Sequence, residues 1–80
     1  MQTKATILRV VQSVINDPTR HETDMETAVS DLMAAGINDT AVLLATFDHL
    51  ADERQPADQR RRAKAAADHL RASMRAHLHG

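Results

Sequence analysis

Apolar side chains between residues 3 and 16 recur every three or four positions. At about 100° per residue they spread over roughly 160° of a helix surface. The set comprises Ile7, Leu8, Val10, Val11, Val14 and Ile15. Many of these residues are β-branched, but the intervening polar positions fit a period of 3.6 better than a period of two. The pattern predicts a helix over residues 3–16 that stops before Pro18, because the residue preceding proline disfavours the α conformation.

A second helix is expected from Thr23 to the residue before Gly36. Thr23 and Glu26 have the spacing of a capping box, and Gly36 tolerates the left-handed conformation that commonly ends a helix. Its apolar positions form one face. They are Met25, Ala28, Val29, Leu32, Met33 and Ala35.

Two further helices follow. Asn38 or Asp39 is a suitable N-cap for a helix that runs to about Arg54. Pro56 then stands near the start of a last helix that extends to about His77, where a missing amide costs little. The inward positions of the third helix are expected to be Leu43, Leu44, Phe47, Leu50 and Ala51, and those of the fourth Ala63, Ala66, Ala67, Leu70 and Met74.

These elements predict an all-α fold: a single, compact four-helix domain over residues 1–80. The second and third helices should form a helical hairpin or a helix-turn-helix-like pair, and the C-terminal helix should be the longest. At this size folding removes only about 60% of the unfolded chain's surface from water, so the core is thin. Phe47 is the only aromatic residue, and we expect it to be buried with Leu32 between the second and third helices.

The chain has no cysteine, so neither a disulfide nor a cysteine-based zinc site can stabilise this small core. Regular helix packing or self-association must supply the stability instead. The composition is compatible with a reducing compartment, and we expect a cytoplasmic protein. The longest apolar runs fall far short of the roughly 20 residues that a membrane-spanning helix needs, and the N-terminus lacks a signal-peptide core.

Charge divides the chain into two unequal parts. Residues 1–53 carry nine acidic and three basic residues, whereas residues 54–80 carry two acidic and seven basic ones. On a helical projection five of the C-terminal cations lie within about 100° of one another, opposite the alanine and leucine face. We call this set the basic stripe: Arg60, Arg61, Lys64, Arg71 and Arg75.

The basic stripe has three interpretations. It could be a solvated face with local ion pairs from Asp68 to Lys64 and Arg71, a surface that docks an acidic protein, or a surface that follows a phosphate backbone. The nucleic-acid interpretation is weakened because the chain lacks the aromatic side chains that single-strand binders stack on bases.

The short link between the second and third helices also resembles the turn of a helix-turn-helix. The exposed face of the third helix, however, has no arginine, lysine or glutamine to read bases. It carries carboxylates that would repel phosphate, among them Asp48 and Asp52. The sequence therefore argues against DNA reading by this helix.

No catalytic, cofactor or metal site is predicted. The five histidines make no i, i+4 pair and no HExxH motif, and the serines stand in helical positions without a glycine elbow. There is no cysteine nucleophile and no phosphate-binding glycine loop. A domain of this size also rarely encloses a large pocket. We therefore expect a protein that is not an enzyme.

The remaining hypothesis is a protein–protein interaction module, such as a small regulator or inhibitor of a larger partner, or a homodimer. Its support is the broad apolar face of the first helix, whose margins Leu8 and Val10 are expected at an interface, together with the polarised charge. The alternative is an accessory protein that binds nucleic acid through the basic stripe.

Overall fold

The computed structural model describes the backbone of residues 3–79 and the side chains of residues 3–76. Four α-helices follow one another, with a single 3₁₀ turn, η1 (Glu22–Asp24), before the second of them. The helices are α1 (Lys4–Ile15), α2 (Met25–Ala34), α3 (Thr40–Leu50) and α4 (Ala57–His79). Between residues 3 and 79 there is no strand, so the predicted all-α, four-helix fold is confirmed.

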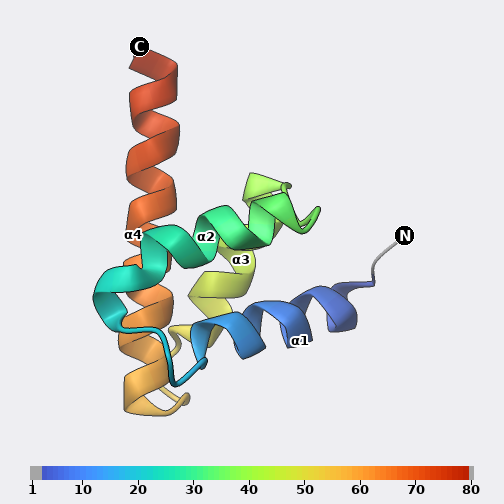
Figure 1. The fold of residues 1–80 in the computed structure, drawn as a ribbon, viewed down its shortest axis with the longest axis vertical. Helices are drawn as coiled ribbons and strands as arrows, with labels where there is room; N and C mark the ends of the chain where they lie inside the picture. Colours follow the sequence, from blue (N-terminus) through green and yellow to red (C-terminus); the bar gives the residue numbers. More distant parts are fainter. Residues whose placement is uncertain (1–2, 80) are drawn as a thin grey trace.

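The long helix α4 is the element around which the others are arranged (Figure 1). Both α2 and α3 have their most extensive backbone contacts with α4, while α1 lies across the end of the molecule opposite the projecting C-terminus of α4. Within the described residues, the backbones of α2 and α3 make no close contact with each other, which differs from a closely packed hairpin but not from the predicted alternative of a helix-turn-helix-like pair. The alanine-rich face of α4 explains this difference, because small side chains let two helices approach α4 closely.

The core is one cluster that draws on all four helices. Phe47 and Leu32 are both buried in it, which confirms their predicted burial; their predicted place between α2 and α3 stays a prediction. The inner face of α4 contributes Ala63, Ala66, Ala67 and Leu70, which are buried, whereas Met74 is only partly so. The expected inner face of α4 is therefore confirmed over its first four positions.

The start of α2 differs from the prediction. Thr23 and Glu26 do not form the capping box. Asp24 takes the acidic role instead, since its carboxylate accepts a hydrogen bond from the backbone N–H of His21 at 2.9 Å. The chain enters the helix through η1, whose N-cap His21 lies two residues before Thr23, and α2 itself begins at Met25. Both residue 24 and residue 26 are acidic. The helical periodicity does not decide which of the two carboxylates accepts the hydrogen bond from the N-cap backbone.

The end of α2 follows the prediction for Gly36. Its φ of +100° lies in the region that favours glycine. The Gly36 N–H donates to the Met33 carbonyl and the Ile37 N–H to the Leu32 carbonyl, both at 3.0 Å, which is the Schellman pattern. Ile37 and Leu32 are both buried, so this turn also supplies core contacts.

Replacing Gly36 by alanine is expected to lower the free energy of unfolding by about 1 kcal/mol, because an L-residue is strained at this φ. A Cβ atom built there meets nothing within 4 Å, so the cost comes from the backbone alone. Urea denaturation measures it. Gly36→Asn is the control and should lose less, since asparagine tolerates left-handed conformations. An unchanged midpoint for the alanine variant would contradict the role assigned to this turn.

Helix α3 begins as predicted but ends early. The Asp39 carboxylate accepts hydrogen bonds from the backbone N–H groups of Ala41 and Val42, at 3.1 and 3.3 Å, so Asp39 is the N-cap. The helix ends at Leu50 rather than near Arg54. There the Asp52 carboxylate accepts from the Arg54 N–H at 2.9 Å, a side-chain turn that competes with further helix.

Two side chains of α4 hold the end of α1. Arg62 donates from Nη1 to the carbonyl oxygens of Ile15 and Asp17, at 3.1 and 2.9 Å. These carbonyls lie at or just beyond the C-terminus of α1, where backbone acceptors lack helical partners and the helix dipole is negative. The guanidinium therefore caps α1 from another helix, a role that the sequence analysis missed.

Gln59, the second of these side chains, is the one buried polar residue in the described core. Its Oε1 accepts from the amides of Gln12 and Asn16, at 3.3 and 2.9 Å. Its Nε2 donates to the Leu50 carbonyl at 3.3 Å and to Gln55 Oε1 at 3.1 Å. Gln59 thus joins α1, the end of α3 and the start of α4 in one hydrogen-bonded network.

The link after α1 is fixed by a local turn. The Asp17 carboxylate accepts from the hydroxyl and the N–H of Thr19, at 2.6 and 2.9 Å. These hydrogen bonds, the hydroxyl first, hold the pKa of Asp17 below its ordinary value. Ionised Asp17 therefore favours the folded state above the ordinary carboxyl pKa, and this contribution is lost as the pH falls through the lowered pKa.

Candidate functional site

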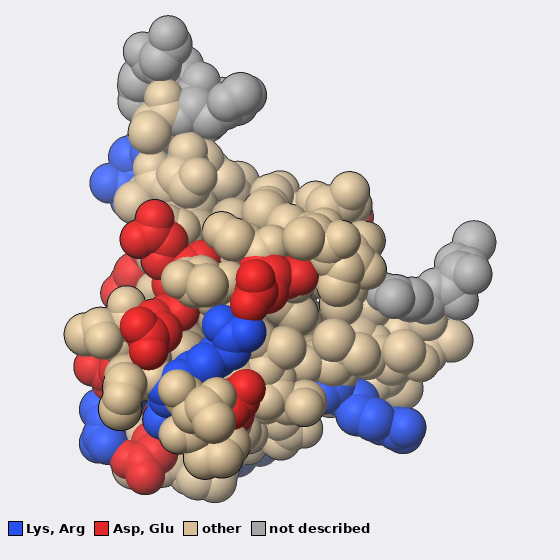
Figure 2. All heavy atoms as spheres, viewed as in Figure 1, with Lys and Arg blue, Asp and Glu red and all other residues tan. Residues whose placement is uncertain are grey.

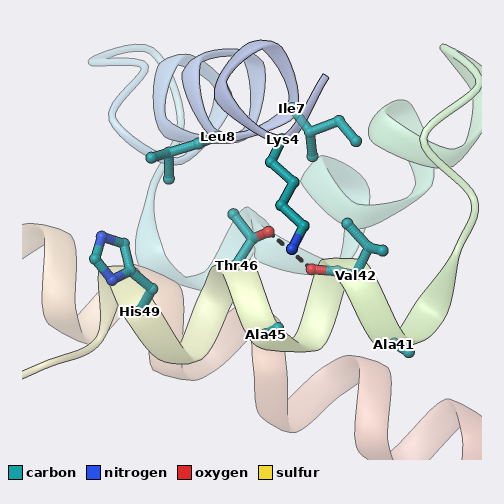
Figure 3. A pocket seen from close by; sticks show the side chains of 8 residues that line it. All are labelled: Lys4, Ile7, Leu8, Ala41, Val42, Ala45, Thr46 and His49. Carbon is teal, nitrogen blue, oxygen red and sulfur yellow. Dashed lines mark hydrogen bonds between the residues drawn. The ribbon is translucent and has the colours of Figure 1, made fainter. Parts of the chain in front are cut away.

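An apolar groove separates the N-terminal half of α1 from α3 (Figure 3). Its volume is about 450 Å³. We call it the α1–α3 groove and define it by its lining residues: Lys4, Ile7, Leu8, Ala41, Val42, Ala45, Thr46 and His49. Its volume exceeds those of four other hollows, which measure about 220–350 Å³.

The groove exists because α1 is buried unevenly along its length. Val11 and Ile15, in the C-terminal half, are fully buried. Ile7 and Leu8, in the N-terminal half, are only partly covered although they belong to the same apolar face. The N-terminal half of α1, which lies away from the Arg62 and Gln59 contacts, therefore presents apolar surface that the described residues do not cover.

Small side chains on α3 form the opposite wall. Ala41 and Ala45 are one helical turn apart and exposed, so they leave room beside Val42. The Thr46 hydroxyl donates to the Val42 carbonyl at 2.7 Å, so this polar group is satisfied within its own helix. The wall is consequently apolar in character despite the threonine.

Only a few of the side chains that line the groove are polar. Figure 3 shows the Lys4 side chain reaching from α1 across the groove toward Thr46 and Val42, with Leu8 and His49 together at one end. Lys4 is the only lining residue with a fixed charge, and no carboxylate lines the groove. A neighbouring hollow of about 240 Å³ shares Ile7 and Val42 with it and extends the depression toward the start of α3.

The two margin residues predicted from the sequence lie in different places. Leu8 lines the α1–α3 groove. Val10 is partly buried, packs against the core, and is not part of the groove lining. The contribution of α3 was missed, because its residues were assigned to an exposed face without any signal that α1 would lie beside them.

The structure divides the basic stripe. Arg71 donates from Nη2 to both carboxylate oxygens of Asp48 at 2.9 Å, and its Nη1 lies 3.9 Å from Asp68. Arg61 pairs with Asp58 and Glu22. Arg71 and Arg61 are therefore less available to an acidic protein or a phosphate than the helical projection indicates. Residues distant in sequence neutralise part of the basic stripe.

The remaining cations of the stripe have no ion pair among the described residues. They are Arg60, Lys64 and Arg75. Arg60, Arg61 and Lys64 line a hollow of about 350 Å³ with Ala51 and Ala57, and Arg75 lines another with Arg71, Leu44 and Met74. Figure 2 shows acidic side chains interspersed with the basic ones on the left of this face, whereas the surface over the end of α2 carries few charges and basic side chains project below α1.

Other site classes receive no geometric support within the described residues. No three potential metal-ligating side chains among them gather closely enough to hold an ion. None of the helices so described is both long and apolar enough to cross a bilayer. Two of the five histidines, His77 and His79, have side chains outside the described part.

Comparison with known proteins adds no family assignment: no protein-family model, curated protein or solved structure matches the chain.

Proposed function

We propose that this chain is a small, non-enzymatic protein–protein interaction module whose α1–α3 groove binds an amphipathic helix of a larger partner, as a regulator or inhibitor does. The observation that carries the proposal is the groove itself, an apolar depression between two helices. Grooves of this kind commonly accept the apolar face of a helix, with anchors at i, i+3, i+4 and i+7.

The charges of the groove define the chemistry of the partner. Lys4 is cationic and no acidic residue lines the groove, so a carboxylate beside the partner's apolar stripe would meet Lys4. Nearby, the Asp39 carboxylate already accepts two backbone hydrogen bonds and is less available to repel such a group. The expected occupant is therefore a helix with an apolar stripe flanked by aspartate or glutamate.

A library of helical peptides displayed on phage, selected on the wild-type protein, tests this proposal. Selected peptides are expected to carry the apolar anchors and at least one flanking acid. Ala45→Glu should lower their affinity by about tenfold or more, measured by fluorescence anisotropy, because it places a charge in the apolar wall. Ala45 is exposed, so the variant should keep its helical circular dichroism and melting temperature.

Two variants make the test specific. Ala72→Glu places the same charge at an exposed position of α4, which does not line the groove, and should leave peptide affinity unchanged. Lys4→Glu should reverse the preference for acidic peptides. Equal loss in the Ala45 and Ala72 variants, or selected peptides without the apolar pattern, would contradict the proposal.

A second copy of the chain is the competing occupant, since the broad apolar face of α1 also suits a homodimer. Sedimentation at high micromolar concentration separates the two cases. A monomer excludes the homodimer and leaves the foreign helix, whereas a dimer that Ala45→Glu dissociates identifies the groove as a self-interface and overturns the foreign-helix assignment.

Nucleic-acid binding through the basic stripe ranks second. The cations without ion pairs favour it. The pairing of Arg71 with Asp48 and of Arg61 with Asp58 and Glu22 weakens it, because paired cations attract phosphates less strongly.

A further inference from the structure

The first turns of α4 contain a second candidate site that shares no lining residue with the α1–α3 groove. Here Arg60, Arg61 and Lys64 surround a hollow of about 350 Å³ beside Ala51 and Ala57. We call it the α4 hollow. Three of its five lining residues are cations, and none is acidic.

Helical spacing explains why these side chains converge. At about 100° per residue, positions 57, 60, 61 and 64 fall within an arc of roughly 100° on one side of α4. Ala57 and Ala51 have only a methyl side chain each. The longer side chains therefore surround a depression rather than a filled surface.

The cations differ in how far the protein neutralises them. Arg61 pairs with Asp58 and Glu22, whereas Arg60 and Lys64 have no carboxylate within ion-pair distance among the described residues. The Nε atom of Arg60 is enclosed and has no hydrogen-bond acceptor. At the other end of the stripe, Arg71 already has its carboxylate in Asp48. Arg60 Nε is thus a buried donor without an acceptor among the described residues.

We propose that the α4 hollow binds a phosphate group, held by Arg60 and Lys64. An arginine fork donates two parallel hydrogen bonds to an oxyanion, and a lysine adds a compact charge. Neither Arg60 nor Lys64 has an ion pair among the described residues to give up when the phosphate binds. Two largely unneutralised cations match the charge of a phosphate monoester better than that of a single carboxylate.

Titration with inorganic phosphate, at an ionic strength kept constant with sodium chloride, tests the proposal. The readout is the Nε–H resonance of Arg60 in ¹H–¹⁵N spectra, which reports the unpartnered donor directly. This resonance is expected to shift saturably as phosphate binds. Phenyl phosphate should give the same shift if the site takes the monoester of a larger molecule. A response to inorganic phosphate alone assigns the site to the free ion.

Lys64→Ala should weaken phosphate binding by about tenfold through the loss of one close charge. Arg60→Lys keeps the charge but not the fork, and should weaken it as well when followed by the amide resonances around Lys64. Arg75→Ala is the matched control, since it removes an exposed cation of α4 that does not line the hollow, and should leave the titration unchanged. Melting temperatures confirm that each variant is folded.

Three results would overturn the proposal. The Arg60 resonance could follow ionic strength alone, acetate could shift it as far as phosphate does, or Lys64→Ala and Arg75→Ala could weaken binding equally. The first result indicates general screening, the second a nonselective anion response, and the third attraction to the whole helix rather than to the hollow.

Discussion

Replacing Phe47 by alanine is expected to lower the free energy of unfolding by about 3–5 kcal/mol, the largest effect among the substitutions considered. Phe47 is the only aromatic residue of the chain, and its relative exposure is 0%. It lies in the single core cluster to which all four helices contribute. Folded domains are stable by about 5–15 kcal/mol, so this loss is most of what a domain with so thin a core has.

Urea denaturation followed by circular dichroism measures the loss. Leu44→Ala is the matched control, because Leu44 lies on the same helix and is only partly buried, so it should lose clearly less. Phe47→Leu should fall between the two, since it leaves a smaller cavity. A Phe47→Ala protein that melts near the wild-type temperature would falsify the assignment of this side chain to the centre of the core.

Replacing Gln59 by leucine is expected to cost about 2 kcal/mol, even though the two side chains are similar in size. The substitution leaves the Leu50 carbonyl without its Nε2 donor in a buried position and removes the acceptor of Gln12 and Asn16. Gln12 and Asn16 are exposed and can turn to water, so most of the loss comes from the buried carbonyl.

Gln55→Leu is the control for Gln59. Gln55 accepts one hydrogen bond from Gln59 and is only partly buried, so the same change there should cost a few tenths of a kcal/mol. Urea denaturation of both variants compares them directly. If the two substitutions cost the same, Gln59 does not organise the network described here.

Local signals along the chain predict much of this fold. Gly36 and Asp39 fix the end of α2 and the start of α3, because each acts through its own backbone or its nearest amides. A capping pattern does not decide the start of a helix when two acidic residues fit it. At the start of α2 Asp24 takes the role expected of Glu26. The early end of α3 was missed because a turn made by Asp52 leaves no trace in the hydrophobic period.

The candidate sites were only partly predictable, because both depend on which helices become neighbours. The breadth of the apolar face on α1 indicates that Leu8 keeps apolar surface outside the core. It does not indicate that Ala45 lies across the groove from Leu8. Helical spacing likewise places Arg71 on the basic stripe. Its partner Asp48 is 23 residues away in the sequence, and no periodicity connects the two.

The attachment of α1 has a consequence for the order in which the molecule folds. The hydrogen bonds from Gln59 and Arg62 to the end of α1 join residues 43–47 positions apart, whereas the turn at Gly36 forms between near neighbours. Closing a long loop costs more chain entropy than closing a short one. We therefore expect α2, α3 and α4 to assemble first and α1 to dock last, so that the groove is completed only in the final step of folding.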